Sequence, residues 1–238
     1  MRVRVDVRLK SPVPERPRFE MKMVADERLL PRVQSWLRQH PDGFYERHPS
    51  RMVNSVYFDT PDMHRFVENL GGASERRKVR LRWYGERATG VRPVFEIKCK
   101  RNKIGWKISH RLREPIDIEG STWRDIRREV RSELDDELRL HLDTSGRPVL
   151  IVRYQREYYV TADGVIRATV DYGLQAFDQR HARRPNLRFP EPMPRELIIE
   201  LKGPSDQGDR MVEAIASIPL RVTKRSKYAL GVGSALGY

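Results

Sequence analysis

The chain has 238 residues and carries 47 Lys and Arg against 33 Asp and Glu, which gives a formal net charge of +14. Hydrophobic residues make up 38% of it and include 4 Trp, 9 Tyr and 7 Phe. This is enough bulk for a buried core, so a wholly disordered chain is excluded. The excess of cations indicates a polyanionic partner, and composition leaves nucleic acid, an anionic membrane and a phosphate-rich small molecule open.

Cysteine content and hydropathy bear on the cellular location of the protein and on its association with membranes. Cys99 is the single cysteine, which excludes an internal disulfide framework and a cysteine-built zinc site and favours a reducing, cytoplasmic location. No run approaches the roughly 18 to 20 apolar residues that span a bilayer. Residues 1–10 also lack the apolar stretch of a signal peptide. We therefore expect a soluble protein without a membrane span.

Three helices are predicted from apolar residues spaced three and four positions apart, over residues 25–40, 122–138 and 206–218. Before them, residues 1–17 alternate charge with Val and Leu and run into prolines, which predicts a peripheral arm or edge strand. The Pro- and Arg-rich stretch 181–194 is typical of a long surface loop.

The remaining segments have the alternating pattern of β-strands. Asp163 and Gly164 lie between two such segments, and an Asp-Gly pair favours a hairpin turn because glycine adopts positive φ readily. The sequence therefore predicts the α+β class with a largely antiparallel sheet. No boundary divides residues 18–238 into two domains.

Charged residues occupy one face of several predicted strands. Side chains alternate between the faces of a strand. Lys78, Arg80 and Arg82 thus share one face, and Val79 and Leu81 share the other. The same division recurs in residues 18–23, 95–100, 165–171 and 199–202.

Such a face has two interpretations. It can be the solvated outer side of a sheet that lies on a core. However, like charges opposite one another across strands are destabilising. If the sheet curls into a barrel, the cations of all strands converge on one positive interior that requires a compact polyanion.

Three glutamates, Glu20, Glu96 and Glu200, lie on these charged faces. Carboxylates can bind Mg²⁺ or Mn²⁺, which prefer oxygen ligands and bridge phosphate oxygens. They can equally pair with neighbouring Arg and Lys side chains. The sequence leaves both roles open.

An ordered set of short motifs resembles a known family. The motifs are Arg18-Phe-Glu20-Met-Lys22, Ser55-Val-Tyr57-Phe58-Asp59-Thr60, Val79-Arg80-Leu-Arg82-Trp83-Tyr84-Gly85, Phe95-Glu96-Ile-Lys98, Tyr154-Gln-Arg156, Ile166-Arg167-Ala-Thr-Val-Asp171, Ile199-Glu200-Leu-Lys202 and Lys224-Arg-Ser226-Lys227-Tyr228. They appear in the order found in the VTC domain, the catalytic unit of the vacuolar transporter chaperone polyphosphate polymerase. That domain belongs to the triphosphate tunnel metalloenzymes of the CYTH-like superfamily, and the resemblance covers about residues 18–230.

The resemblance implies an antiparallel β-barrel tunnel with flanking helices. It implies that ATP or another nucleoside triphosphate, together with inorganic polyphosphate or triphosphate, is held by Lys22, Arg80, Arg82, Lys98, Arg156, Arg167, Lys202, Lys224 and Lys227. Of these, Arg80, Arg82, Lys98 and Lys227 are the expected catalytic residues. Glu200 matches the metal-binding glutamate, with Glu20 and Glu96 as further candidates for Mn²⁺ or Mg²⁺.

The first motif departs from that of related triphosphatases, and the difference bears on which reaction is expected. Tunnel triphosphatases of the CYTH type begin with Glu-x-Glu-x-Lys, whereas Arg18 stands at the first carboxylate position here. This departure favours a polyphosphate polymerase that transfers the γ-phosphate of ATP to a growing chain. A triphosphatase is the alternative enzyme.

A non-catalytic polyphosphate- or nucleic-acid-binding module is the third reading. Its support is the net charge and the aromatic residues near basic ones, at Trp83-Tyr84 and Tyr158-Tyr159. Nucleic acid is the less favoured partner, because no zinc-finger spacing or ribonucleoprotein motif is present. The oligomeric state is left open.

Other chemistries find little support in the sequence. There is no Gly-x4-Gly-Lys-Ser/Thr phosphate loop. Cys99 lies on the apolar face of its strand, which predicts a core residue. Asp59 is expected to cap a strand end or turn, and Lys100, Lys103 and Lys107 to guide substrate or to be solvated.

Overall fold

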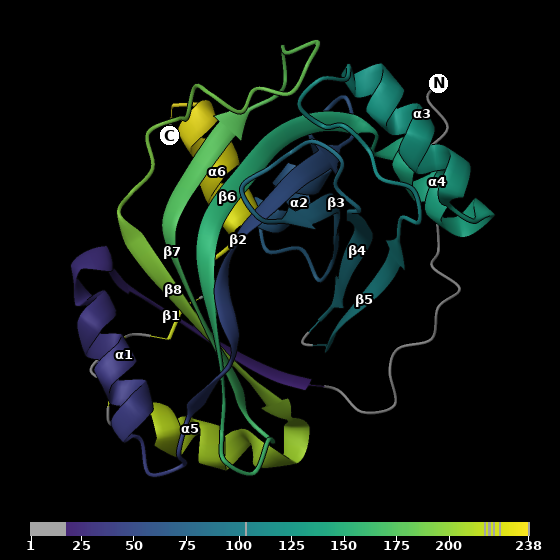
Figure 1. Cartoon of the computed structure of the whole chain (residues 1–238). Coiled ribbons are helices and arrows are strands. Elements are labelled where there is room, and N and C mark those ends of the chain that lie inside the picture. The colour runs from purple at the N-terminus through teal and green to yellow at the C-terminus, as the bar shows by residue number, and fades with distance from the viewer. Residues whose placement is uncertain are drawn as a thin grey trace.

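The computed structural model describes residues 18–102, 104–216, 218, 220, 222–223 and 225–237. One antiparallel sheet of eight strands dominates it, with the spatial order β1-β8-β7-β6-β2-β3-β4-β5 (Figure 1). The strands are β1 (Arg18–Asp26), β2 (Tyr45–Asp59), β3 (Glu75–Tyr84), β4 (Val94–Arg101), β5 (Ile104–Arg111), β6 (Arg147–Val160), β7 (Arg167–Asp178) and β8 (Glu196–Pro204). The predicted α+β class with an antiparallel sheet is confirmed.

Six α-helices flank the sheet in the described residues: α1 (Leu30–Gln39), α2 (His64–Leu70), α3 (Trp123–Glu133), α4 (Asp136–Thr144), α5 (Gly208–Ala216) and α6 (Lys227–Ala235). Short 3₁₀ turns, Glu27–Leu29 and Ser205–Gln207, precede α1 and α5. In Figure 1, α1 and α5 lie at the β1–β8 side and α3 and α4 at the opposite side. Within the described residues, no helix is long and apolar enough to cross a membrane.

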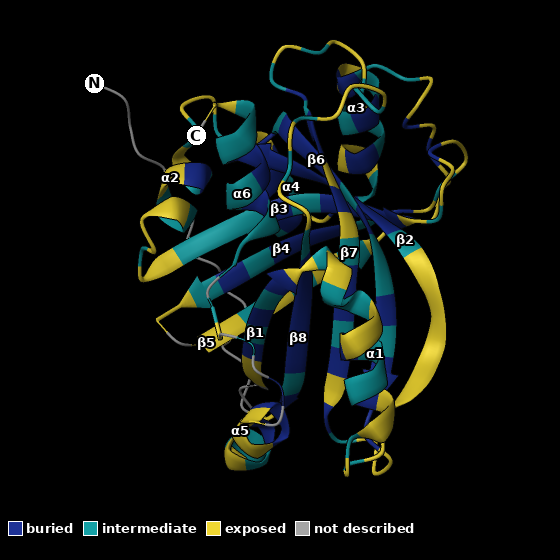
Figure 2. Cartoon of the chain, turned by 90° about the vertical axis from the view of Figure 1, so that its left-hand side faces the viewer, coloured by how far each residue is buried: buried dark blue, intermediate teal, exposed yellow. Residues whose placement is uncertain are grey.

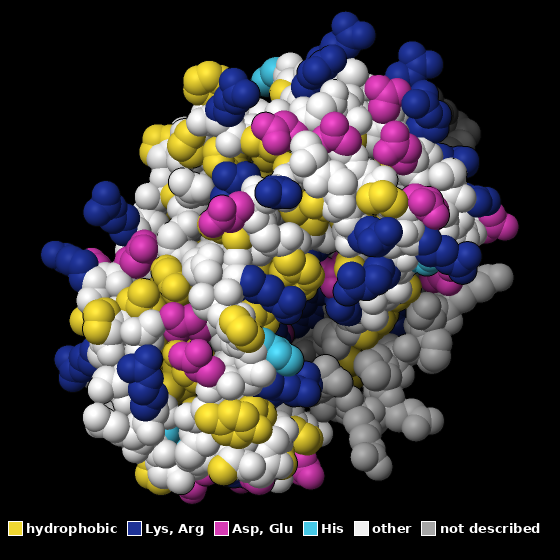
Figure 3. Space-filling view, viewed as in Figure 1, with side chains coloured by type: hydrophobic (Ala, Val, Ile, Leu, Met, Phe, Trp, Pro, Cys, Tyr) yellow, Lys and Arg dark blue, Asp and Glu magenta, His cyan; other side chains and the backbone are white. Residues whose placement is uncertain are grey.

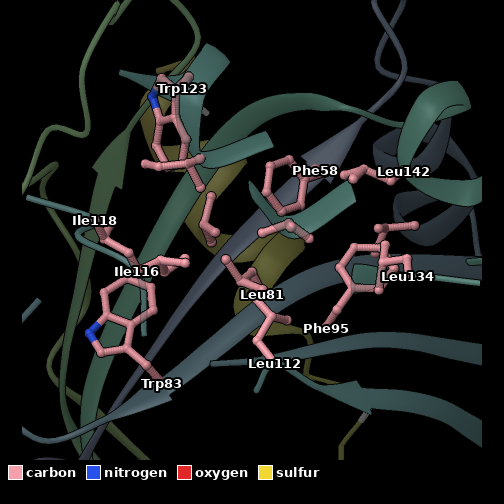
Figure 4. Close-up of a cluster of buried hydrophobic side chains, with 14 of the residues drawn as sticks. Phe58, Leu81, Trp83, Phe95, Leu112, Ile116, Ile118, Trp123, Leu134 and Leu142 are labelled. Carbon is pink, nitrogen blue, oxygen red and sulfur yellow. The ribbon is translucent and has the colours of Figure 1, made fainter. Parts of the chain in front are cut away.

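The convex face of the curled sheet carries two hydrophobic clusters. One joins β3 and β4 to α3 and α4, and Phe58, Leu81, Trp83 and Phe95 are among its buried members (Figure 4). The other packs α1 and α5 against β1, β7 and β8. Burial of these apolar residues fixes the strand register, because a slip by one residue would turn every side chain to the opposite face. Figure 2 shows the alternation of buried and more exposed residues along several strands.

A third cluster lies on the concave face, where α6 packs on β6 and β7. Tyr228 of α6 stacks on Tyr57 with ring centroids 4.9 Å apart, and Val152 and Val232 are buried beside them. Gly231 permits this close approach, because a Cβ there would lie 2.6 Å from a side-chain carbon of Leu150. This third cluster covers only part of the concave face, and polar side chains occupy the rest.

The hairpin turn and the surface loop agree with expectation. Gly164 has φ +75° between β6 and β7, and residues 181–194 contain neither helix nor strand. The predicted arm, residues 1–17, lies outside the described residues.

Three helix predictions need correction. The first helix begins at Leu30 because β1 continues to Asp26, and the third begins at Gly208 after a 3₁₀ turn. The second prediction covers two helices, because Leu134 ends α3 in an extended conformation and the Asp135 side chain caps α4. The expectation that everything else is strand missed α2 and α6.

The expected curling of the antiparallel sheet is confirmed, and the sheet is open between its two end strands. β1 and β5 end the sheet on either side, and no backbone pairing joins them in the described part of the chain. The sheet is curled but not closed (Figure 1).

Candidate functional site

Cations from several strands meet on the concave face. Alternation places their side chains on the side opposite the convex core, as the sequence predicts. In Figure 3, Lys and Arg side chains gather around a hollow in this face. We call the following residues the concave cluster: Glu20, Lys22, Lys78, Arg80, Arg82, Glu96, Lys98, Arg156, Arg167, Asp171, Glu200, Lys202 and Lys227.

Glu20 and Glu200 share two lysines. Lys22 Nζ lies 3.0 Å from Glu20 Oε1 and 2.8 Å from Glu200 Oε1. Lys202 Nζ lies 2.5 Å from Glu200 Oε2 and 3.9 Å from Glu20 Oε2. Burial opposes ionisation of both acids, but the lysines outweigh it: the pKa of Glu20 falls to about 2 and that of Glu200 falls well below its ordinary value. Burial likewise opposes the charge of Lys22, yet Glu200 and Glu20 raise its pKa.

An ion pair spans the gap that the backbone leaves open. Lys98 Nζ of β4 lies 3.6 Å from Glu20 Oε2 of β1. Since β1 is one end of the sheet and β4 is next to the other end, this contact joins the two sides of the concave face. Burial and the nearby charge of Lys22 lower the pKa of Lys98 to about 8, although Glu20 opposes this.

Glu96 is held separately from the other two glutamates. Its Oε2 accepts a hydrogen bond of 2.6 Å from Arg80 Nε, and its Oε1 accepts one of 2.7 Å from Lys107 Nζ. Burial would raise the pKa of Glu96, but Arg80, Arg82 and Lys107 lower it to about 2. Lys107 is therefore a partner of Glu96 and not simply a solvated residue.

Asp171 pairs with two cations of the concave cluster. Arg156 donates to both of its carboxylate oxygens, at 2.5 and 2.6 Å, and Lys227 Nζ lies 2.5 Å from Oδ2. Asp171 is fully buried; burial opposes its charge, but Arg156 and Lys227 lower its pKa. Arg156 and Lys227 also lie over the ring of Tyr154, at 5.3 and 4.8 Å from its centroid.

Two further cations of the concave cluster donate hydrogen bonds to hydroxyl groups. Arg82 donates to Ser55 Oγ at 3.1 Å and to Tyr154 Oη at 3.3 Å. Lys78 Nζ donates to Ser226 Oγ at 2.7 Å. Burial, followed by the charges of Lys98 and Lys22, lowers the pKa of Lys78 well below its ordinary value.

The expected site residues are thus largely brought together. Lys22, Arg80, Arg82, Lys98, Arg156, Lys202 and Lys227 lie in the network above, and Arg167 is the cross-strand partner of Lys202 on the same face. Lys224 and Lys103 lie outside the described residues.

Sequence reasoning missed Lys78, Asp171, Tyr154 and Ser226 as members of the site. Lys78 shares the strand parity of Arg80, and Asp171 is on the charged parity of its own strand, so the pattern contained a signal for both. Nothing in the pattern identifies a hydroxyl partner such as Ser226.

Two residues outside the cluster behave as expected. Cys99 is buried, and burial raises the pKa of its thiol to about 12. Asp59 accepts hydrogen bonds from the N–H groups of Arg65 and Phe66 at the start of α2 and from the Tyr228 hydroxyl. It is a capping residue.

The carboxylates bear on a possible metal site. Glu20 and Glu200 share lysine partners and are ionised at neutral pH, which suits Mg²⁺ or Mn²⁺ that keep water and phosphate oxygens as their other ligands. Glu96 does not join them, since no group of three metal-ligating residues occurs in the described residues. The donor set therefore fits a metal held by one or two protein carboxylates and a bound phosphate.

The cations of the concave cluster outnumber its four carboxylates. The curled antiparallel sheet with its flanking helices also occurs in solved structures of low sequence identity. The fold is similar to that of a candidate adenylate cyclase from Vibrio parahaemolyticus, with a TM-score of 0.51 and 9% identity, covering 90% of this chain and 97% of that one. A candidate adenylyl cyclase from Hippeastrum, described as having a dominant triphosphatase activity, gives a TM-score of 0.49 and 15% identity over 93% of this chain and 96% of that one.

The family follows from the sequence. The VTC domain model matches residues 17–236, so the chain belongs to the VTC domain family. No curated protein matches it.

Proposed function

We propose that the chain is a polyphosphate polymerase that transfers the γ-phosphate of ATP to the end of an inorganic polyphosphate chain. Membership of the VTC domain family and the excess of cations on the concave face support this function. In the proposed complex, Lys22, Arg156, Arg167, Lys202 and Lys224 hold phosphate oxygens. Arg80, Arg82, Lys98 and Lys227 act on the phosphoryl group that is transferred.

In this reaction the protein has to position the reactants and supply positive charge, and it needs no covalent intermediate. A terminal oxygen of the acceptor chain forms a bond to the γ-phosphorus, and the bond between that phosphorus and the β,γ-bridging oxygen breaks. The products are a chain longer by one phosphate and ADP. Guanidinium and ammonium groups stabilise the negative charge on the equatorial oxygens in the transition state. A divalent ion held by Glu200 and Glu20 would neutralise further phosphate charge.

One observation favours transfer to phosphate over hydrolysis. All four carboxylates of the concave cluster are ion-paired, and the pKa values of Glu20 and Glu96 are about 2. Carboxylates with such low pKa values are weak general bases, so they are poorly suited to activate water. A polyphosphate end is already an anion and needs no base. This distinction carries the proposal.

The test is incubation with ATP and Mn²⁺, followed by separate measurement of long-chain polyphosphate and orthophosphate. We expect long chains, and we expect Arg82→Met to reduce their rate of formation about 100- to 1,000-fold, as for loss of one charge-stabilising donor. Arg32→Met, on the exposed side of α1, is the matched control and should leave the rate unchanged. Release of orthophosphate without polyphosphate would identify a triphosphatase instead. Binding without turnover would leave only the binding module.

A further inference from the structure

An exposed aromatic group adjoins the concave cluster and is not used by the proposed reaction. The guanidinium carbon of Arg51 lies 4.2 Å from the ring centroid of Tyr84 and 4.9 Å from that of Tyr158. Arg51 Nε also donates to Tyr158 Oη at 3.1 Å. Arg51 is exposed and 37% of the surface of Tyr84 remains accessible. We call Arg51, Tyr84 and Tyr158 the aromatic rim.

The aromatic rim lies on the same face of the sheet as the concave cluster and next to it. Tyr84 has the strand parity of Arg82, two residues away on β3. Arg51 is the direct cross-strand partner of Arg156. A molecule whose phosphates contact Arg82 and Arg156 can therefore reach the rim with its other end.

A cavity of about 720 Å³ opens beside Tyr84, at the end of β3 and the loop that leads to β4. Its lining includes Trp83, Tyr84, Arg87, Arg92 and Arg111. The Trp83 side chain itself is 1% exposed and packs in the convex cluster, on the opposite face of β3 from Tyr84.

We propose that the aromatic rim and its cavity bind the nucleobase of the nucleoside triphosphate, with the base against Tyr84 and the phosphates extending over Arg82 and Arg156 into the concave cluster. This inference rests on the proposed function, because it gives the nucleotide a direction in the site. Every base has a flat π-face that stacks on an aromatic ring, and a guanidinium group adds a cation–π contact.

A mononucleotide fits the aromatic rim better than a nucleic acid strand does. Binding of single strands relies on a series of stacking platforms along a basic groove. Here a pair of tyrosines flanks one arginine, and the adjacent cations curl into a concave face. One base joined to a short chain of phosphates matches this arrangement.

The test compares ATP with tripolyphosphate, which has the charge but no base. Dissociation constants are measured by calorimetry for the wild type, Tyr84→Ala, Tyr84→Phe and the control Tyr45→Ala, which removes another exposed tyrosine of the sheet. We expect Tyr84→Ala to bind ATP about tenfold to a hundredfold more weakly, as for loss of a base–aromatic stack. Its affinity for tripolyphosphate should stay within twofold, which also shows that the variant is folded. Tyr84→Phe and Tyr45→Ala should behave as the wild type does.

The outcomes separate the two proposals. If the wild type binds both ligands and Tyr84→Ala binds ATP normally, the inference fails and the proposed function stands. The inference also fails if Tyr84→Ala weakens ATP and tripolyphosphate equally, since the rim then acts on phosphates. If the wild type binds neither ligand, both fail. Tighter binding of a single-stranded oligonucleotide than of ATP, lost in Tyr84→Ala, would replace the mononucleotide with a nucleic acid strand.

Discussion

The lowered pKa of Lys98 makes triphosphate binding depend on pH in a way that one substitution can isolate. In the free protein, burial and Lys22 lower the pKa of Lys98 to about 8. At pH 8 about half of the molecules therefore carry an uncharged Lys98. A bound triphosphate surrounds this amine with negative charge and favours its ammonium form. Binding should therefore take up about half a proton at Lys98 at this pH.

The direction and size of the pH dependence of triphosphate affinity follow from the linkage between proton binding and ligand binding. Because the complex binds more protons than the free protein, affinity falls as pH rises through 8, with a slope that approaches about tenfold per pH unit for this residue. Lys78, whose pKa is also lowered, adds to the effect in the same direction. Glu20 and Glu200 stay ionised in this range and do not contribute.

The measurement is calorimetric titration with tripolyphosphate at pH 7, 8 and 9, in buffers that differ in ionisation enthalpy. The ligand's own titration is common to all variants, so the difference between wild type and Lys98→Met reports on Lys98. We expect the variant to take up about half a proton less at pH 8. Lys107→Met, which removes a half-exposed lysine that is paired with Glu96, should resemble the wild type. Equal uptake by Lys98→Met and wild type would refute the reasoning.

Three further predictions concern other parts of the site and the core. Asp171→Asn should lower the free energy of unfolding in urea by about 3–5 kcal/mol, because it leaves Arg156 and Lys227 without their buried partner; the exposed Asp136→Asn should change it by less than about 1 kcal/mol, and similar values for the two would contradict the role of Asp171. Glu200→Gln should require at least about tenfold more Mn²⁺ for half-maximal activity, whereas Glu96→Gln should keep the wild-type requirement; the reverse ranking would place the metal at Glu96. Cys99, whose pKa is raised to about 12 by burial, should resist a thiol reagent at pH 8 in the native protein and react fully in urea, and rapid native labelling would show that the convex core opens.

The two faces of the sheet were predictable because alternation is a local property of a strand. Val79 and Leu81 point to the convex core, and Lys78 and Arg80 point to the concave side, as their parity requires. Their partners were not predictable in the same way. The choice between a metal role and an ion-pair role for Glu96 depends on Arg80 and Lys107, which approach it from two neighbouring strands.

Helices α2 and α6 were missed because the local sequence pattern does not indicate a helix in either segment. Helix α2 has seven residues, too few for a clear apolar period, and its start is held by Asp59 from the end of β2. Helix α6 contains Gly231 and Gly233, which have low helix propensity. Gly231 is needed for close packing on Leu150. Packing on the sheet, and not propensity, stabilises α6.

The ion pairs divide the cations of the concave cluster into two groups. Lys22 is committed to Glu20 and Glu200, and its pKa is raised. At Lys78 and Lys98, burial and neighbouring cations outweigh any nearby carboxylate, and the pKa values of both lysines are lowered. A polyanion therefore gains most beside Lys78 and Lys98, whose positive charge the free protein stabilises least.

A side-chain contact also bridges the open side of the sheet. The contact between Lys98 and Glu20 joins β4 to β1 through side chains alone. A phosphate chain between these strands would contact lysines from both sides and reinforce that link. The same charges that repel one another across the free face would then hold its two sides together around the ligand.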